Sequence, residues 1–266
     1  MYRIIFFLFC FSSTSYSPAQ ALEAKPKLHS HNDYLQRVPY WEAYAAQIES
    51  IEADVILLDG ELYVAHEEAS IKRNRTLSSL YLDPIRKTRE LNLEGADKFQ
   101  LLIDLKTEAY ATLKKLVEIL AEYEDIFTSP GNTPSVDVVI SGNRPLPQDY
   151  RNYPNYILFD YQSVSDTTGL PLERIALISL NFKKLSTWDG SGQIDPKELK
   201  ALQDAISVAH SLGKPIRFWA TPDGERAWKI LTDLGVDYIN TDHPYEARAF
   251  VHQLKKKRPT SATYLE

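Results

Sequence analysis

The sequence has a single cysteine, Cys10, among its 266 residues, and this scarcity limits the covalent chemistry of the chain. Cys10 lies in an N-terminal segment with the features of a secretory signal, and removal of that segment would leave a mature protein without thiols. Disulfide bonds and cysteine-ligated metal sites are then excluded. The absence of disulfides is compatible with an oxidising compartment but does not require one.

The chain also lacks an excess of basic residues and an apolar run long enough to cross a bilayer. Its formal net charge is −6 at pH 7, which disfavours a nucleic-acid partner because such proteins normally present a basic face. The apolar run at residues 4–11 is too short to span a membrane. We therefore expect no nucleic-acid partner and no transmembrane segment, and we expect a monomer.

Residues 1–21 have the organisation of a secretory signal. A short basic start at Arg3 precedes the apolar run, and Ala19-Gln20-Ala21 forms a small-x-small cleavage site. We predict cleavage after Ala21 and a secreted or periplasmic location. Lipidation of Cys10 is the alternative, and it is disfavoured because the bulky Phe9 stands where a small residue is expected.

Short apolar segments alternate with amphipathic helical patterns along the rest of the chain. The predicted strands are residues 27–31, 51–57, 62–65, 100–105, 136–141, 156–159, 175–180, 215–220 and 238–241. The second and third are joined by Asp59-Gly60, a hairpin signal, and eight strands remain when the hairpin return is set aside. Eight strands alternating with helices predict an α/β fold, a single-domain TIM-type (β/α)8 barrel over residues 22–254 with a small β-hairpin after strand 2. Residues 255–266, which begin with a basic KKKR run, are predicted to form a polar tail.

Two carboxylates lie inside an apolar segment, in the run Ile51-Glu52-Ala53-Asp54-Val55. Side chains of a strand alternate between its faces, so Glu52 and Asp54 point to one side and the apolar residues to the other. Ionised carboxylates in apolar surroundings need a partner. A divalent cation is a single partner that satisfies both, and the segment therefore predicts a metal site.

The hairpin that follows brings His66 back toward Asp54. A strict two-residue turn at Asp59-Gly60 pairs position 66 with Ala53, on the wrong face, whereas one extra residue pairs it with Asp54. We therefore predict a bulged or three-residue turn near Gly60.

Further polar residues lie at or near the carboxyl ends of the predicted strands, where the active sites of TIM-type barrels gather. Asp104 adds a third carboxylate to Glu52 and Asp54, and three oxygen ligands suit Mg²⁺ or Ca²⁺ better than zinc. A simple ion pair between Asp104 and Lys106 is the alternative. The other residues that we expect to contact a substrate are Asn143, Asn181, Arg217 and Trp219.

Two histidines are candidates for acid-base catalysis. His31 and His66 follow predicted strands, and the unperturbed pKa of a histidine lies near neutrality, as this role requires. We expect His29 to be a structural histidine.

The motifs HSHNDY, IEADV, VAHE, IDLK, FWATPD and GVDYINTDHP occur in this order and span nearly all of the chain after residue 21. They resemble the motifs of the glycerophosphodiester phosphodiesterase and phosphatidylinositol phospholipase C-like superfamily. The resemblance is closest to its altered-inheritance-of-mitochondria branch, with its HSHNDY start and LYLDP segment. It implies a TIM-type barrel, in agreement with the strand count, and a phosphodiesterase activity.

Carried over by position, the resemblance implies roles for individual residues. His31 and His66 would be the acid/base pair, and one divalent cation would be held by Glu52, Asp54 and Asp104. Lys106 would contact the phosphate, and Trp219 would line the substrate pocket. The nucleophile would be a neighbouring substrate hydroxyl, which gives a cyclic phosphate.

Two departures from the resemblance leave the head group open. Asn32 replaces the arginine that usually follows the first histidine of glycerophosphodiesterases. Asp104 stands where many of them have glutamate, and aspartate followed by Lys106 is similar to the sphingomyelinase D-like branch. Five aromatic residues are candidates for a wall around a choline-like group, although ordinary packing is the simpler explanation for most of them: Tyr153, Tyr156, Tyr161, Phe182 and Trp188.

The predicted function is a secreted, metal-dependent phosphodiesterase that acts on a small-molecule or lipid phosphodiester. The alternatives are a sphingomyelinase D-like lyase and a non-catalytic metal-binding barrel. A non-catalytic barrel would not need an acid/base pair. An amidohydrolase-like zinc site built on His29 and His31 needs further histidines on the middle strands. None occurs between His66 and His210.

Overall fold

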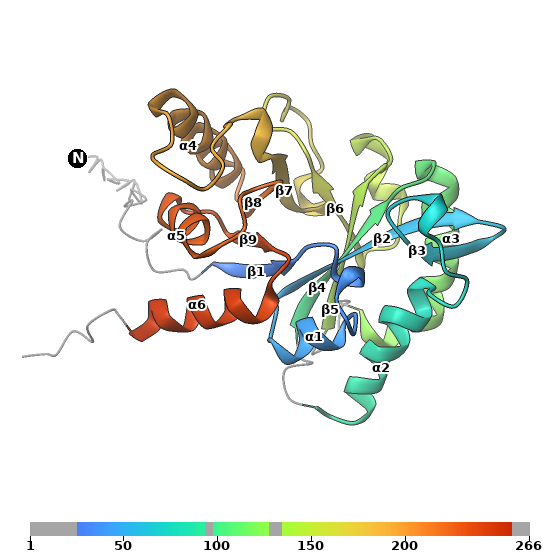
Figure 1. Ribbon diagram of the computed structural model, residues 1–266. Coiled ribbons are helices and arrows are strands. Elements are labelled where there is room, and N and C mark those ends of the chain that lie inside the picture. The colour runs from blue at the N-terminus through green and yellow to red at the C-terminus, as the bar shows by residue number, and fades with distance from the viewer. Residues whose placement is uncertain (1–25, 94–97, 128–134, 257–266) are drawn as a thin grey trace, which may run out of the picture.

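The protein is a closed eight-stranded parallel barrel with one extra antiparallel strand (Figure 1). The computed structural model describes residues 26–93, 98–127 and 135–256. β1 (Lys27–Ser30) pairs in parallel with both β2 (Ser50–Leu58) and β9 (Tyr238–Thr241), and these two pairings close the barrel. The strands between them follow in the order β4 (Lys98–Leu105), β5 (Ser135–Gly142), β6 (Ile157–Tyr161), β7 (Ile175–Asn181) and β8 (Ile216–Trp219). The prediction of a TIM-type barrel is confirmed.

Helices cover most of the outside of the barrel. The α-helices are α1 (Trp41–Ala45), α2 (Asp83–Glu90), α3 (Ala109–Leu120), α4 (Pro196–Ser211), α5 (Glu225–Leu234) and α6 (Pro244–Lys256). The chain that follows β5 and β6 has only short 3-10 helices, η5 (Pro147–Asn152) and η6 (Leu172–Arg174). Regular β/α alternation is therefore interrupted on this side of the barrel.

Strand β2 has the alternation that its sequence predicts. Ile51, Ala53 and Val55 are buried in the main hydrophobic core, which leaves Glu52 and Asp54 on the face toward the barrel interior. A second, small apolar cluster consists of Leu102, Val139, Leu177 and Tyr238. Leu102 and Val139 lie two positions before Asp104 and Ser141, polar residues of the site described below, so by alternation this cluster forms an apolar layer of the interior next to that site.

The hairpin after β2 differs from the prediction. β3 (Glu61–Val64) pairs with β2 in a register that places Leu58 opposite Glu61, so the turn has only two residues, Asp59 and Gly60. Both have positive φ, 51° and 78°, as a tight hairpin turn requires. The prediction of a bulged or three-residue turn was wrong.

His66 nevertheless reaches the face of Asp54, because the strand ends before it. β3 stops at Val64, and the backbone N–H of Ala65 donates to the carbonyl of Asp54 at 3.2 Å. Beyond that point the chain leaves the ladder, and its side chains no longer follow the strand alternation. The end of pairing, rather than an extra turn residue, therefore allows His66 to face Asp54.

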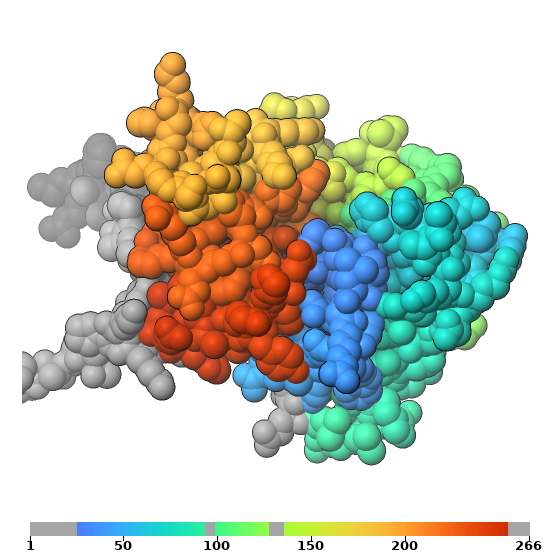
Figure 2. Space-filling model, viewed as in Figure 1, coloured from blue at the N-terminus to red at the C-terminus, as the bar shows by residue number. Residues whose placement is uncertain are grey.

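The space-filling view shows the surface of residues that follow β1 (blue) between surfaces from the C-terminal part of the chain (red and orange) and from residues after β2 (cyan) (Figure 2). None of the helices among the described residues is both long and apolar enough to cross a membrane. The predicted signal sequence, residues 1–21, lies outside the described residues, as does the tail beyond Lys256, where α6 ends.

Candidate active site

A cleft of 430 Å³ opens at the carboxyl ends of the barrel strands. It is lined by His31, Asn32, Glu52, His66, Asp104, Leu105, Lys106, Ser141, Gly142, Asn143, Gln162, Arg217 and Trp219. Two predicted site residues are outside this lining. Asp54 is fully buried but bonds to cleft residues, whereas the Asn181 side chain accepts a hydrogen bond from the backbone N–H of Lys183 at the start of a 3-10 helix.

Three carboxylates meet beside the cleft because β2 and β4 pair with Asp54 opposite Asp104. Glu52, Asp54 and Asp104 offer oxygens that lie within 4.8 Å of one another. The Oδ1 atom of Asp54 is buried and has no hydrogen-bond partner among the described residues. A buried carboxylate oxygen without a partner is costly, so this set of oxygen donors fits a hard divalent cation.

Lys106 is shared between two of the three carboxylates. Its Nζ lies 3.1 Å from Oδ2 of Asp54 and 3.0 Å from Oδ1 of Asp104. Burial raises the pKa of Asp104 to about 6; the charge of Lys106 opposes this shift, and those of Glu52 and Asp54 add to it. The simple ion pair considered from the sequence does exist, but it leaves Oδ1 of Asp54 unpartnered.

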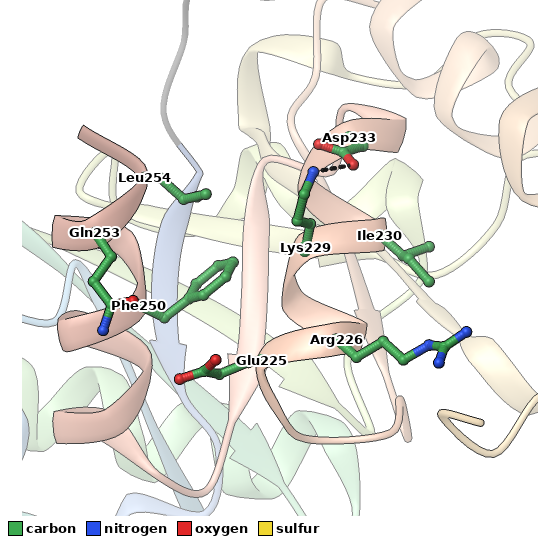
Figure 3. Close-up of a pocket in the computed structure, with 8 residues that line it drawn as sticks. All are labelled: Glu225, Arg226, Lys229, Ile230, Asp233, Phe250, Gln253 and Leu254. Carbon is green, nitrogen blue, oxygen red and sulfur yellow. Dashed lines mark hydrogen bonds and ion pairs between the residues drawn. The ribbon is translucent and has the colours of Figure 1, made fainter. Parts of the chain in front are cut away.

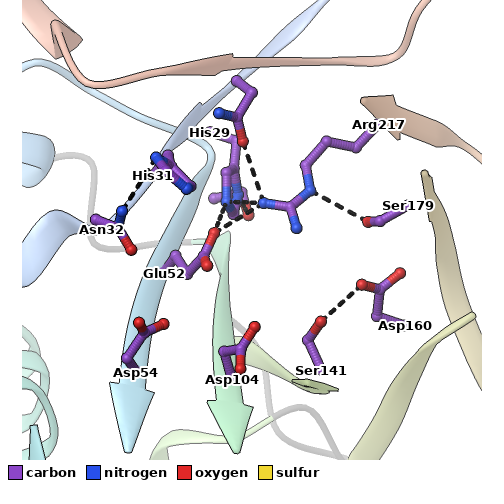
Figure 4. Close-up of polar contacts among 12 residues, drawn as sticks. His29, His31, Asn32, Glu52, Asp54, Asp104, Ser141, Asp160, Ser179 and Arg217 are labelled. Atoms are coloured by element: carbon purple, nitrogen blue, oxygen red, sulfur yellow. Dashed lines mark hydrogen bonds and ion pairs between the residues drawn. The ribbon is translucent and has the colours of Figure 1, made fainter. Parts of the chain in front are cut away.

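Glu52 belongs to a buried hydrogen-bond network (Figure 4). Its Oε2 lies 2.7 Å from Nε2 of His29 and 2.8 Å from Nη1 of Arg217, and Nδ1 of His29 lies 2.7 Å from the hydroxyl of Ser50. Burial raises the pKa of Glu52, but Arg217 and His29 outweigh it and hold this pKa well below its usual range. Burial and Arg217 lower the pKa of His29 to about 3. Glu52 is therefore ionised and His29 neutral.

Each of the two candidate catalytic histidines is oriented by a carboxylate. Nδ1 of His31 donates to Oδ1 of Asp242 at 2.8 Å, and Nδ1 of His66 donates to Oδ2 of Asp54 at 2.8 Å. A hydrogen bond through Nδ1 leaves Nε2 as the nitrogen available for proton transfer. Burial acts to lower the pKa of His31, but the hydrogen bond and charge of Asp242 and the charge of Glu52 raise it overall.

The residues after His31 in the HNDY motif have structural roles. Asn32 has a left-handed conformation with φ 47°, which asparagine tolerates better than most residues. The hydroxyl of Tyr34 donates to Oδ2 of Asp54 at 2.8 Å. Asp33 is fully buried and holds the loop by accepting hydrogen bonds from the Ser30 hydroxyl, the Tyr40 backbone N–H and the Tyr81 hydroxyl.

Several residues of the site were not predicted from the sequence. Gly142 ends β5 with φ +68°, and a Cβ there would lie 2.1 Å from Oδ1 of Asp104, so only glycine allows this close approach. Ser141 donates to Oδ2 of the buried Asp160 at 2.8 Å and accepts from Nε2 of Gln162 at 3.2 Å. The glycine at a strand end was a usable sequence signal, whereas the Ser141 contacts depend on neighbouring strands.

The candidate aromatic wall is not part of the cleft. Tyr156 stacks on Phe127, Tyr153 packs against Phe159, and Phe182 packs against Phe218. The hydroxyl of Tyr161 donates to a loop carbonyl, as does the indole N–H of Trp188. Trp219 is the one aromatic residue that lines the cleft within the described part of the chain.

A larger cavity, of 620 Å³, lies between α5 and α6 on the outside of the barrel (Figure 3). Its walls combine apolar side chains, such as Phe250 and Leu254, with the Lys229–Asp233 ion pair of 2.6 Å. None of the predicted catalytic or metal-binding residues lines it. The smaller cleft at the strand ends is therefore the candidate active site.

The barrel fold is shared with several phosphodiesterases of known structure. The structure is similar to a glycerophosphodiester phosphodiesterase from Parabacteroides distasonis, with a TM-score of 0.59 and 16% identity over 87% of this chain and 99% of the other. It is also similar to a Ca²⁺-dependent phosphatidylinositol-specific phospholipase C from Streptomyces antibioticus, with a TM-score of 0.56 and 9% identity over 85% and 96% of the two chains. An Oleispira antarctica phosphodiesterase in complex with sn-glycerol-3-phosphate has a TM-score of 0.51 and 13% identity, over 86% of this chain and 97% of the other.

The sequence comparisons are more specific. The AIM6-like phosphodiesterase domain matches residues 22–146, and the glycerophosphoryl diester phosphodiesterase family matches residues 215–245. The altered inheritance of mitochondria protein 6 homolog of Arthroderma benhamiae is 27% identical over 84% of this chain and 83% of its own length. The Lachancea thermotolerans protein is 29% identical over 82% of this chain, but only 63% of its own length is covered. The resemblance to this branch, inferred from the motifs, is confirmed.

Replacement of Asp242 by asparagine is expected to lower the pKa of His31, because it removes the negative charge that the imidazolium faces. The raised pKa also means that the Asp242–His31 pair stabilises the fold fully below pH 6.5, and that this contribution is lost as the pH rises through the folded-state pKa. NMR titration of the imidazole in chelator-treated protein measures the shift. Asp233→Asn, on α5, is the control. An unchanged His31 pKa in Asp242→Asn would contradict the conclusion that Asp242 raises this pKa.

Replacement of Gly142 by alanine is expected to displace Asp104 and to weaken divalent-cation binding, which calorimetry measures. Gly169→Ala is a matched control, because Gly169 has φ +71° but nothing within 4 Å of the added Cβ. The control should cost only the left-handed strain, about 1 kcal/mol of unfolding free energy. Equal effects of the two substitutions on stability and cation binding would show that the contact with Asp104 is unimportant.

Proposed function

We propose that this protein is a metal-dependent phosphodiesterase that uses His31 and His66 as its acid/base pair. One observation carries the proposal: two histidines, each oriented by a carboxylate through Nδ1, line a cleft beside a cluster of three carboxylates. Proton donors and acceptors beside an oxygen-ligand cation site are the parts that cleavage of a phosphodiester requires.

The residues of the cleft divide the reaction among them. Lys106 and Arg217 are the cationic side chains of the cleft lining, and they attract the phosphoryl group. His31, whose pKa is raised, is suited to protonate the leaving alcohol, and His66 accepts the proton of the nucleophile. Glu52, Asp54 and Asp104 would hold a divalent cation, which supplies charge stabilisation at a phosphoryl oxygen.

The nucleophile and the location of the protein belong to the same proposal. By resemblance, the nucleophile is a hydroxyl of the substrate, and the first product is a cyclic phosphate. The substrate is a small-molecule or lipid phosphodiester. Secretion or export to the periplasm after cleavage behind Ala21 is tested by N-terminal sequencing of the protein recovered outside the cytoplasm.

A phosphorus NMR assay of a small panel of diesters tests the function directly. Glycerophosphocholine, glycerophosphoinositol, lysophosphatidylcholine and sphingomyelin are incubated with the mature protein and Mg²⁺ or Ca²⁺, with and without chelator. A product signal that chelator abolishes supports the proposal, and a cyclic phosphate signal identifies the substrate hydroxyl as nucleophile. Cation binding without turnover of any diester would favour the non-catalytic barrel.

Substitution of either histidine by glutamine is expected to lower the turnover rate by about 10²- to 10⁴-fold, the usual contribution of a general acid or base. Calorimetry should show that His31→Gln still binds the cation, because among the described residues the hydrogen bonds of the His31 ring go to Asp242 and Asn32 and not to the three carboxylates. His210→Gln is the control, since His210 pairs with Asp237 outside the cleft. Loss of less than tenfold in both variants would rule out these roles.

A further inference from the structure

The three carboxylates beside the cleft do not offer all of their oxygens to a cation. Oε2 of Glu52 accepts from both Nε2 of His29 at 2.7 Å and Nη1 of Arg217 at 2.8 Å. His29 is fully buried and Arg217 is only 3% exposed, so neither donor can turn away to water. Oε2 of Glu52 is therefore held by the protein, and Oε1 remains.

The direction of the His29 hydrogen bond follows from its neighbours. The amide of Gln100 donates to the Ser50 hydroxyl at 2.8 Å, and this hydroxyl lies 2.7 Å from Nδ1 of His29. Nη1 of Arg217 also contacts Nε2 of His29. An ionised carboxylate can only accept a hydrogen bond, and an unprotonated Nε2 at 2.7 Å from Oε2 would set two acceptors against each other, so Nε2 carries its proton toward Glu52. In a neutral ring Nδ1 is then an acceptor, which the Ser50 hydroxyl satisfies. This order of donors fixes the orientation of Glu52.

The two aspartates are restricted in the same way. Oδ2 of Asp54 accepts from the Tyr34 hydroxyl at 2.8 Å and from Nδ1 of His66 at 2.8 Å, and it lies 3.1 Å from Nζ of Lys106. Only its buried Oδ1 has no partner among the residues that the structure describes. Oδ1 of Asp104 is buried and accepts no hydrogen bond among the described residues, but it forms an ion pair of 3.0 Å with Lys106 and lies against Gly142. The oxygen of Asp104 left for a cation is therefore Oδ2.

We propose that this site selects Mg²⁺ over Ca²⁺, because each carboxylate has one free oxygen: Oε1 of Glu52, Oδ1 of Asp54 and Oδ2 of Asp104. Mg²⁺ is six-coordinate and is commonly bound by few carboxylate oxygens together with water and substrate phosphate. Ca²⁺ takes six to eight oxygens and often uses a carboxylate through both of them. The inference rests on the proposed cation site and names the ion that it takes.

The occupied carboxylate oxygens also give roles to two residues that take no part in the proposed proton transfers. His29 and Tyr34 act through Glu52 and Asp54 and are positioning residues. Neighbours that orient metal ligands typically change metal affinity by about 10- to 100-fold when they are replaced. In this site they are expected to change the preference between two cations as well as the affinity.

Calorimetric titration of chelator-treated, full-length protein with Mg²⁺ and with Ca²⁺ tests the inference without any substrate. The dissociation constant for Ca²⁺ is expected to exceed that for Mg²⁺, because Ca²⁺ loses the two-oxygen carboxylate contacts that it often uses. Tighter binding of Ca²⁺ would overturn the inference and leave the proposed function standing. If neither cation binds, the proposed cation site itself fails.

Substitutions at Lys106 and at His29, each with a control, test the explanation. Lys106→Met releases Oδ1 of Asp104 and should improve Ca²⁺ binding more than Mg²⁺ binding, whereas Lys184→Met changes the same charge on an exposed residue outside the cleft lining. His29→Leu should lower the ratio of the two dissociation constants, and His29→Gln, which retains a donor, should restore it. If His29→Leu does not fold, Lys106→Met decides, and an unchanged ratio in Lys106→Met would refute the role of the occupied oxygens.

Discussion

The concentration of negative charge at one end of the barrel is the constraint on which the rest of the site depends. Within this cluster, Glu52, Asp54 and Asp104 form ion pairs with two cationic side chains, Lys106 and Arg217. One negative charge is left in excess, and a divalent cation would convert it to a positive one. A singly charged phosphodiester would then meet a site of opposite sign, which gives the cluster both its affinity for a cation and its suitability for this class of substrate.

Neutralising this charge also fixes the geometry. Lys106 joins the two strands β2 and β4 through Asp54 and Asp104, and Arg217 joins β8 to β2 through Glu52. The same carboxylates position the histidine and tyrosine side chains that contact them. The interactions that make the buried acids tolerable therefore hold the strand ends together and align the groups proposed for catalysis.

Much of this arrangement could be predicted from the sequence, because it depends on local alternation and strand order. The opposite faces of Ile51 and Glu52 and the gathering of polar residues at the strand ends both follow from such rules. The tight turn at Gly60 was missed because the prediction assumed that pairing continues to His66, whereas it stops at Val64.

Other features depend on contacts that the sequence order does not contain. His29 is buried, as expected of a structural histidine, but its acceptor Glu52 and its neighbour Arg217 come together only when the barrel closes. The same holds for the approach of Asp104 to Gly142. Which oxygen of a carboxylate is already used by the protein depends on distances between side chains of several strands, and only coordinates can provide these.

The central claim is that the free oxygens of Glu52, Asp54 and Asp104 bind one divalent cation beside His31 and His66. A crystal grown with Mn²⁺ in place of Mg²⁺ and measured at the manganese absorption edge tests it most directly. The account predicts one anomalous peak at coordination distance, about 2.2 Å, from an oxygen of each of the three carboxylates. A peak elsewhere, or no peak in the cleft at saturating Mn²⁺, would contradict the account.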